Sequence, residues 1–408
     1  MQENPALSDS DPSLLLNSSL WWAALVAMGV SALASAVLLA SRRWHLRLTS
    51  DSDFSRPQRI HSGEVPRIGG VAIVSGLLAG VAWAAYTQPS INANHVLPWW
   101  LAGLLPVAGV GLVEDLTQRI RPLIRMAWMM LGSLIWLLGT GYWLHRLNLS
   151  WIDPLMALPL IGVGFSIFAC LGAINAYNII DGLNGLLAGV SGLSLLTIAL
   201  VADIVGDTLV LQIALCLMLA LAGWMPFNWP RARLFAGDGG AYCIGFLTVT
   251  LLFALVARND QVSPWFGLAA AALPVAETLY SIWRRFRSGM DAMQPDQFHL
   301  HQLMRHRMHW NRSRKLMHES GVMGHQALAA LRRSLRVHGK LPADAPNASV
   351  SPRLWSLHGI AALFGVWLHA NTLGLIALCI VFGVVYVLVH RKLDAAWERT
   401  HSLPDRVN

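Results

Sequence analysis

Residues 208–226 read TLVLQIALCLMLALAGWMP, and residues 239–257 read GGAYCIGFLTVTLLFALVA. Neither stretch contains a charged residue, and each is long enough to cross a hydrocarbon core about 30 Å thick as a helix. Further apolar segments of near this length lie along the chain at 20–41, 68–87, 97–113, 123–143, 155–174, 185–203, 264–283, 354–370 and 372–390. The sequence therefore predicts an all-α polytopic membrane protein with about 11 transmembrane helices.

The composition agrees with a membrane chain. Of the 408 residues, 55% are hydrophobic and 13% are charged, whereas soluble domains carry about 25% charged residues. The formal net charge of +8 does not indicate a nucleic-acid partner, because most arginines fall in segments between apolar runs. The basic segments are 42–67, 114–122, 227–238 and 284–353. The positive-inside rule places these segments on the cytoplasmic side of the membrane, with the N-terminus periplasmic and the C-terminus cytoplasmic. We expect this membrane to be a bacterial inner membrane.

These patterns divide the chain into five parts. We expect a periplasmic tail (1–19), a catalytic transmembrane core (20–283), a basic cytoplasmic loop with a histidine motif (284–353), two C-terminal spans (354–390) and a cytoplasmic tail (391–408). A polytopic transporter is the alternative from another functional class. It would favour ionisable residues near the membrane centre and internal repeats, and the sequence shows neither.

Four carboxylates interrupt the apolar chain at span ends that the topology assigns to the cytoplasmic face: Glu114, Asp115, Asp181 and Asp238. Ionisable groups at a membrane boundary persist where they pair or bind something. Magnesium prefers one or two carboxylates completed by water and substrate phosphates, so we expect an Mg²⁺ site here, with Mn²⁺ as an alternative. Asn175, Asn178, Asp181 and Asn184 are three apart and would share one face if the helix continued through them.

The same residue types suit a reaction between two phosphates. Two unit charges 4 Å apart repel by about 4 kcal/mol at an effective dielectric constant near 20. Phosphoryl transfer depends mostly on positioning and on offsetting this charge, which a metal ion and arginines can do. The clustered carboxylates and the neighbouring arginines therefore predict phosphoryl-transfer chemistry at the cytoplasmic face.

Several motifs resemble the polyprenyl-phosphate N-acetylhexosamine-1-phosphate transferases, a family related to the phospho-N-acetylmuramoyl-pentapeptide transferase. They are HSGEVPRIGG (61–70), NAYNIIDGLNG (175–185) and FNWPRARLFAGDGG (227–240), and the similarity runs from about residue 56 to 306. The resemblance implies transfer of an N-acetylhexosamine-1-phosphate, with UDP-N-acetylglucosamine the commonest donor, to undecaprenyl phosphate. UMP would leave, and a lipid-linked glycan such as O-antigen or exopolysaccharide would begin. The partners would be these substrates and membrane lipids; a homodimer is left open.

The resemblance also assigns roles to individual residues. It implies that Asp238 is the principal metal ligand and that Asp181 belongs to the same metal and catalytic site. Glu114 and Asp115 occupy the family's acidic pair, whose first member is often proposed as the base for the lipid phosphate. The substrate-binding residues implied by the motifs are Arg59, His61, Arg67, Asn175, Asn178, Asn228, His299 and His301.

The sequence departs from the family pattern at three positions. Glu114 stands where an aspartate is usual, Asn184 where many members have aspartate, and Gln302 where a second histidine often follows. These departures favour a sugar-only donor over the peptidoglycan precursor, which remains the alternative substrate. They also leave open an inactive relative that serves as a scaffold. Direct attack by the lipid phosphate is the favoured mechanism, with a covalent aspartyl intermediate as the alternative.

Each candidate also has a purely structural interpretation. An aspartate before glycine is a common turn residue, so Asp181 and Asp238 could only cap helices. Arg67 could be a topological anchor, and His299 and His301 could be solvated loop residues. Glu277 is expected at a polar contact between helices, and residues 305–340 could form an amphipathic helix on the membrane surface.

Overall fold

The computed structural model describes residues 14–50, 64–89, 95–289, 298–319 and 347–401. In this part of the chain every regular element is a helix, and the β contacts are limited to one bridge between Ser50 and Pro66. The helices in chain order are η1 (Leu14–Leu16), α1 (Ser18–Ala40), α2 (Arg42–Thr49), α3 (Gly69–Thr87), α4 (Leu97–Thr117), α5 (Pro122–Thr140), α6 (Asp153–Met156), α7 (Pro159–Ile180), α8 (Leu186–Val205), α9 (Thr208–Asn228), α10 (Gly237–Arg258), α11 (Phe266–Ala270), α12 (Ala272–Arg287), α13 (Leu300–Glu319), α15 (Ser351–Trp367) and α16 (Thr372–His401).

The predicted polytopic helical architecture is confirmed. Among the described residues, nine helices are long and apolar enough to cross a membrane: α1, α3, α4, α5, α7, α8, α9, α10 and α16. The other two predicted spans take a different form. Residues 264–283 contain α11 and part of α12, separated by a break at Ala271, and residues 354–370 overlap α15, which is 17 residues long. The number eleven and the membrane orientation therefore stay predictions.

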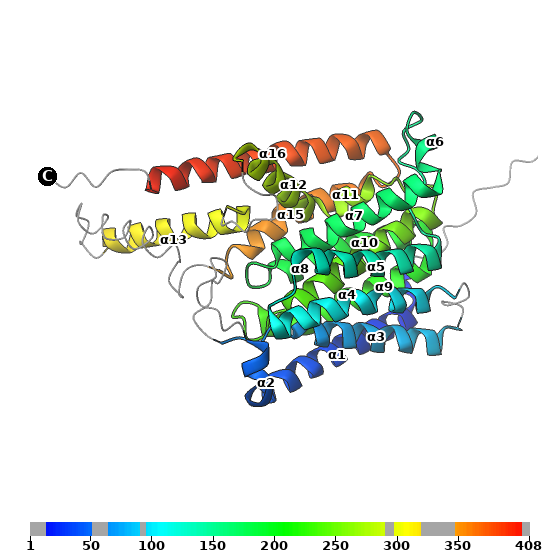
Figure 1. Ribbon diagram of the computed structural model, residues 1–408, viewed down its shortest axis with the longest axis horizontal. Helices are drawn as coiled ribbons and strands as arrows, with labels where there is room; N and C mark the ends of the chain where they lie inside the picture. The colour runs from blue at the N-terminus through cyan, green and yellow to red at the C-terminus, as the bar shows by residue number, and fades with distance from the viewer. Residues whose placement is uncertain (1–13, 51–63, 90–94, 290–297, 320–346, 402–408) are drawn as a thin grey trace, which may run out of the picture.

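Helix α10 forms the centre of the bundle. Within its apolar stretch 94% of the residues are buried, and it packs against α3, α4, α7, α8 and α9. The neighbouring spans run roughly along the same direction, with α1 and α3 on one side and α16 on the other (Figure 1). A helix that is apolar on all faces can lie in the core of a bundle or face lipid, and the contacts of α10 with its neighbours place it in the core.

Glycines allow the backbones of α3 and α4 to pack directly against the backbone at the start of α10. A Cβ atom on Gly111 of α4 would lie 2.4 Å from the Cα atom of Gly239, and one on Gly70 of α3 would lie 2.4 Å from the Cα atom of Gly240. No side chain larger than hydrogen fits such contacts. The end of α4 and the start of α3 are therefore held directly against the first turn of α10.

Helix α13 and the C-terminal part of α16 lie side by side and extend beyond one end of the bundle (Figure 1). The start of α13 is attached to α12 through buried polar contacts described below. The amphipathic helix expected at residues 305–340 corresponds in part to α13; residues 320–346 lie outside the described chain.

Candidate active site

Asp115 holds the first turn of α10. It lies in the last turn of α4, is 1% exposed, and its carboxylate accepts two backbone hydrogen bonds. Oδ1 accepts from the N–H of Asp238 and Oδ2 from the N–H of Gly239, both at 2.8 Å. The first N–H groups of a helix lack partners within the helix and carry partial positive charge. Asp115 therefore caps α10 from another helix and fixes the backbone of Asp238.

The turn before α10 is equally constrained. Gly237 has a φ of 75°, and a Cβ atom there would lie 1.9 Å from the carbonyl oxygen of Arg67. Backbone hydrogen bonds hold the Arg67 segment on both sides. Arg67 N donates to Thr49 O, and Phe235 N donates to Pro66 O, each at 2.9 Å. The glycine-rich GDGG sequence is therefore required by backbone packing as well as by turn conformation.

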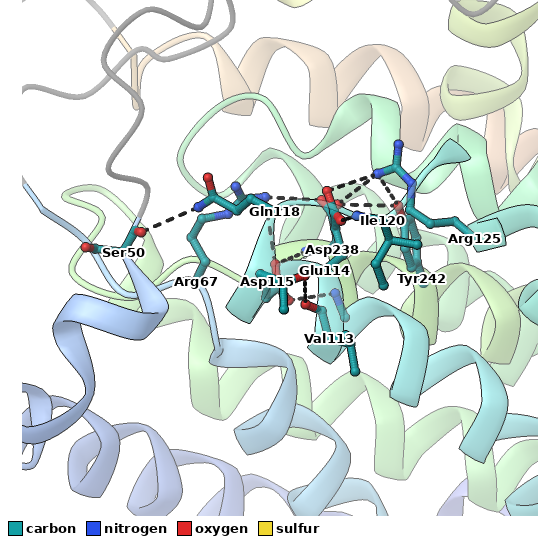
Figure 2. A network of polar contacts seen from close by, with 12 residues as sticks. Ser50, Arg67, Val113, Glu114, Asp115, Gln118, Ile120, Arg125, Asp238 and Tyr242 are labelled. Carbon is teal, nitrogen blue, oxygen red and sulfur yellow. Dashed lines mark hydrogen bonds and ion pairs between the residues drawn. The ribbon is translucent and has the colours of Figure 1, made fainter. Parts of the chain in front are cut away.

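Asp238 projects from this turn between two arginines (Figure 2). Its Oδ1 atom lies 3.2 Å from Arg67 Nη2, and its Oδ2 atom lies 3.3 Å from Arg125 Nη1. The hydroxyl of Tyr242 donates to the same Oδ2 atom at 3.4 Å. The side chain keeps 16% of its surface exposed. Asp238 is therefore an accessible carboxylate within a charged cluster, and Arg67 is an ion-pair partner rather than only a topological anchor.

Glu114 joins the same cluster. Its Oε2 atom accepts from the backbone N–H of Ile120 at 2.9 Å, and its Oε1 atom lies 3.6 Å from Arg125 Nη1. The cluster thus combines the carboxylates of Glu114, Asp115 and Asp238 with the guanidinium groups of Arg67 and Arg125. Its formal charge is −1, which suits a cation. The role of Glu114 as a base stays a prediction.

Arg125 and Tyr242 were not identified from the sequence. Arg125 lies in α5, and its Nη1 atom is within 3.6 Å of Glu114, Asp238 and the Tyr242 hydroxyl. The available signal was an arginine inside an apolar span, which is energetically costly unless the charge is paired. Tyr242 lies one turn after Asp238 and gave no such signal.

The structure corrects the expected helical face of asparagines. Helix α7 ends at Ile180, so Asp181 occupies its C-cap and Asn184 lies in the following turn. Asn175 remains on α7 and bonds the carbonyl of Leu171, while Asn184 donates to the carbonyl of Pro230. The sequence Asp-Gly after Ile180 favours a turn, and the four side chains therefore do not share one helical face. The substrate contacts predicted for Asn175 and Asn178 stay predictions.

Asp181 nevertheless lies near the charged cluster. Burial raises the pKa of Asp181 to about 8; the positive charge of Arg67 lowers this pKa and the negative charge of Asp238 raises it. Asp181 is half-buried, so part of its surface is accessible. The electrostatic interactions with Arg67 and Asp238 show that the turn after α7 and the start of α10 face a common region.

His299 and His301 are buried at the start of α13, which excludes solvated loop residues. Their exposed fractions are 5% and 1%, and their rings are stacked with centroids 5.5 Å apart. Glu277 Oε1 lies 2.8 Å from His299 Nδ1, and both Glu277 oxygens accept from the N–H of Leu300 at 3.2 Å. The expected interhelical contact of Glu277 is thus found: the carboxylate holds His299 and caps α13.

His301 connects α13 to the Asp181 turn. A Cβ atom on Gly182 would lie 2.3 Å from His301 Nε2, so the imidazole packs against the backbone directly after Asp181. The structure therefore brings Asp181, Asp238, Arg67 and His301 to one end of the bundle. Phosphate binding by the two histidines stays a prediction.

Asn228 has a structural function in this geometry. Its Oδ1 atom accepts from the N–H of Gly185 at 2.6 Å, its Nδ2 atom donates to the carbonyl of Leu234 at 3.2 Å, and the residue is 3% exposed. These bonds join the end of α9 to the start of α8. The predicted contact of Asn228 with a nucleotide sugar is untested, and Arg59 and His61 lie outside the described residues.

The arrangement fits a magnesium ion held by few protein ligands. Within the described residues, no group of three His, Cys, Asp or Glu side chains has the geometry of a closed metal site. Asp238 is partly exposed and Asp181 lies in the same region, which leaves coordination positions for water and substrate phosphates. Mg²⁺ is usually bound in this way.

Comparison with known proteins agrees with this site. A family model described as glycosyl transferase family 4 matches residues 97–256, the segment from α4 to α10 that contains Glu114, Asp115, Asp181 and Asp238. This segment of the chain is similar to glycosyl transferase family 4. The family segment also contains Arg125 and Tyr242, whereas Arg67 and the histidines of α13 lie on either side of it.

Individual proteins are similar to this chain over a longer stretch. The probable undecaprenyl-phosphate N-acetylglucosaminyl 1-phosphate transferase of Bacillus subtilis (strain 168) is 28% identical over 249 residues, 60% of this chain and 66% of that protein. The undecaprenyl-phosphate alpha-N-acetylglucosaminyl 1-phosphate transferase of Escherichia coli (strain K12) is 28% identical over 252 residues, with the same coverage. The decaprenyl-phosphate N-acetylglucosaminephosphotransferase of Mycobacterium leprae (strain TN) is 25% identical over 273 residues, 61% of this chain and 68% of that protein. The chain thus matches just under two thirds of the length of the first two relatives.

Proposed function

We propose that this protein transfers N-acetylglucosamine-1-phosphate from UDP-N-acetylglucosamine to undecaprenyl phosphate and releases UMP. The observation that carries the proposal is the position of Asp238, an accessible carboxylate flanked by two arginines and fixed by Asp115. The names of the relatives support undecaprenyl phosphate as the acceptor and N-acetylglucosamine as the sugar. They do not favour the peptidoglycan precursor or a transporter. We place the reaction at the cytoplasmic face of a bacterial inner membrane, in line with the basic loops.

Asp238 and Asp181 are the residues that would hold Mg²⁺. The bound ion would supply Lewis-acid stabilisation of the negative charge that develops on the phosphate oxygens. Arg67 and Arg125 already lie at 3.2 and 3.3 Å from Asp238. Their planar guanidinium groups can bind phosphate through two parallel hydrogen bonds, so they would hold the donor diphosphate beside the same carboxylate.

Glu114 would accept a proton from the lipid phosphate. Its Oε1 atom is 3.6 Å from Arg125, which connects it to the phosphate-binding arginines. The deprotonated lipid phosphate then attacks the sugar-bearing phosphorus, the bond to the UMP oxygen breaks, and UMP leaves. In this direct displacement no aspartyl phosphate forms. Trapping a phosphorylated enzyme would contradict it.

The activity is tested with the purified full-length protein, undecaprenyl phosphate and a panel of UDP-sugars. We expect UDP-N-acetylglucosamine to give a lipid-linked sugar phosphate whose mass matches N-acetylglucosamine-1-phosphate, and labelled UMP to exchange into the donor. The exchange should require both Mg²⁺ and the polyprenyl phosphate. A product that retains a peptide, or no product with any donor, would contradict the proposed function.

The affinity for Mg²⁺ should increase with pH. Because burial raises the pKa of Asp181 to about 8, the metal-free carboxyl group carries a proton at pH 7. A metal ligand must be deprotonated, so Mg²⁺ displaces this proton. We expect the apparent association constant to rise about 50-fold in all between pH 6 and 8, and to level off above the pKa. Calorimetric titration of the Asp181→Asn variant should show a weaker pH dependence; an unchanged dependence would remove Asp181 from the site.

A further inference from the structure

One buried cation near the site has no hydrogen-bond or ion-pair partner among the described residues. Arg305 lies on α13, and only 5% of its surface is exposed. Its Nε atom has no hydrogen-bond partner, and no ion pair joins its guanidinium to any described residue. The other arginines close to the active site, Arg67 and Arg125, both contact carboxylates. Arg305 therefore differs from them in having no anionic partner within the part of the chain that the structure describes.

A buried guanidinium without an anion is unfavourable. Burial lowers the pKa of Arg305 to about 10, so the side chain still carries its positive charge at neutral pH. Proteins retain buried charges mainly where they are paired or bind a charged ligand. The surroundings of Arg305 therefore point to an anion that enters from outside the described chain.

The face of α13 that carries Arg305 begins at the active site. Arg305 follows His301 by four residues, so the two side chains lie on the same face one turn apart. His301 packs against Gly182, beside Asp181. The next residue, His306, contacts Trp397 of α16 with ring centroids 4.3 Å apart. Since consecutive helical residues differ by about 100°, the contact with α16 is on a different face from Arg305.

The direction of α13 indicates which substrate could reach this face. From its start at Leu300 the helix leads away from the spans, alongside the C-terminal part of α16 (Figure 1). Arg305 thus lies one turn further along α13 than His301, away from the spans other than α16. A lipid phosphate is confined to the membrane surface, whereas a nucleotide arrives from the water phase. The position of Arg305 favours the nucleotide.

We propose that Arg305 binds a phosphate group of the nucleotide substrate, one helical turn beyond His301. This inference rests on the proposed function, because it assumes a nucleotide diphosphate sugar as donor. The planar guanidinium can donate hydrogen bonds to two phosphate oxygens side by side. Arg305 would then extend the phosphate-binding surface from Arg67 and Arg125 to α13, and the bound phosphate would supply the missing negative charge.

The kinetic test compares Arg305→Gln with the wild-type protein. Loss of one charge-assisted contact should raise the KM for UDP-N-acetylglucosamine by about 30-fold, while the KM for undecaprenyl phosphate stays within threefold. Arg305→Lys keeps the charge without the planar group and should give an intermediate KM. Arg307→Gln removes an exposed arginine from the same helix and should leave both constants unchanged. A rise in the KM for the lipid instead would assign the anion to the acceptor and overturn the proposal.

A binding test needs no turnover. UDP should raise the unfolding temperature of the wild-type protein and of Arg307→Gln, and should have little effect on Arg305→Gln. Without UDP, Arg305→Gln should unfold at the same temperature as the wild type or higher, because it lacks an unpaired buried charge. A lower unfolding temperature with unchanged UDP binding would show a structural role and overturn the inference. If wild-type protein binds UDP but transfers no sugar phosphate, the proposed function fails and the binding result still decides the role of Arg305.

Discussion

Replacing Asp238 with asparagine should lower kcat for sugar-phosphate transfer by about 1,000-fold, equivalent to about 4 kcal/mol of transition-state stabilisation. The change keeps the size of the side chain but removes the charge that Arg67 and Arg125 contact. It also removes one of two proposed metal ligands, so raising the Mg²⁺ concentration should restore only part of the rate. Labelled UMP exchange over a range of Mg²⁺ concentrations measures both effects.

The matched control is Asp260→Asn. Asp260 also pairs with an arginine, Arg146 at 3.8 Å, but its side chain is 97% exposed and it follows α10 at the end opposite to Asp238. Exposed ion pairs contribute little to stability, so this variant should keep the wild-type rate. An Asp238→Asn protein that exchanges UMP as fast as Asp260→Asn would show that Asp238 is not a metal ligand.

The sequence identified the carboxylates of the site because charge is conspicuous in an apolar chain. Asp115, Asp238 and Glu114 lie at the ends of charge-free spans, and the structure brings them into one cluster with Arg67. Their common location could be predicted because helices that cross a membrane bring their ends to one of only two faces. Tertiary partners could not be predicted in this way. Arg125 belongs to the cluster because of how α5 packs against α4, and one sequence does not specify that packing.

The local backbone geometry and burial of some site residues also could not be predicted from the sequence. The spacing of Asn175, Asn178, Asp181 and Asn184 suits a helix, but the chain leaves the helix at Asp181. The opposite occurred at His299 and His301, where a basic polar segment suggested a loop. The side chains there are buried because Glu277, from a helix more than 20 residues earlier, accepts hydrogen bonds from the first turn of α13. The turn in the first case and the long-range contact in the second determined the structure, and the local sequence pattern shows neither.

Asp115→Asn should also inactivate the protein, although Asp115 is too buried to contact substrate. Its two oxygens each accept a backbone N–H at 2.8 Å, and an asparagine can offer only one acceptor oxygen. Its amide group would face a backbone N–H donor in a site that is 1% exposed. We expect a loss of about 3 kcal/mol in the free energy of unfolding and a fall in kcat of about 100-fold. Thermal unfolding in detergent and UMP exchange measure the two effects separately.

The double variant distinguishes positioning from a catalytic role. If Asp115 acts only by holding the first turn of α10, then Asp115→Asn combined with Asp238→Asn should be no slower than Asp238→Asn alone, within about threefold, because residues that act as a unit are not additive. Rate losses that multiply would mean that Asp115 contributes independently of Asp238. The losses in the free energy of unfolding, in contrast, should be additive. The backbone bonds to Asp115 remain when only the Asp238 side chain changes, so Asp115→Asn should destabilise the protein equally with either residue at position 238.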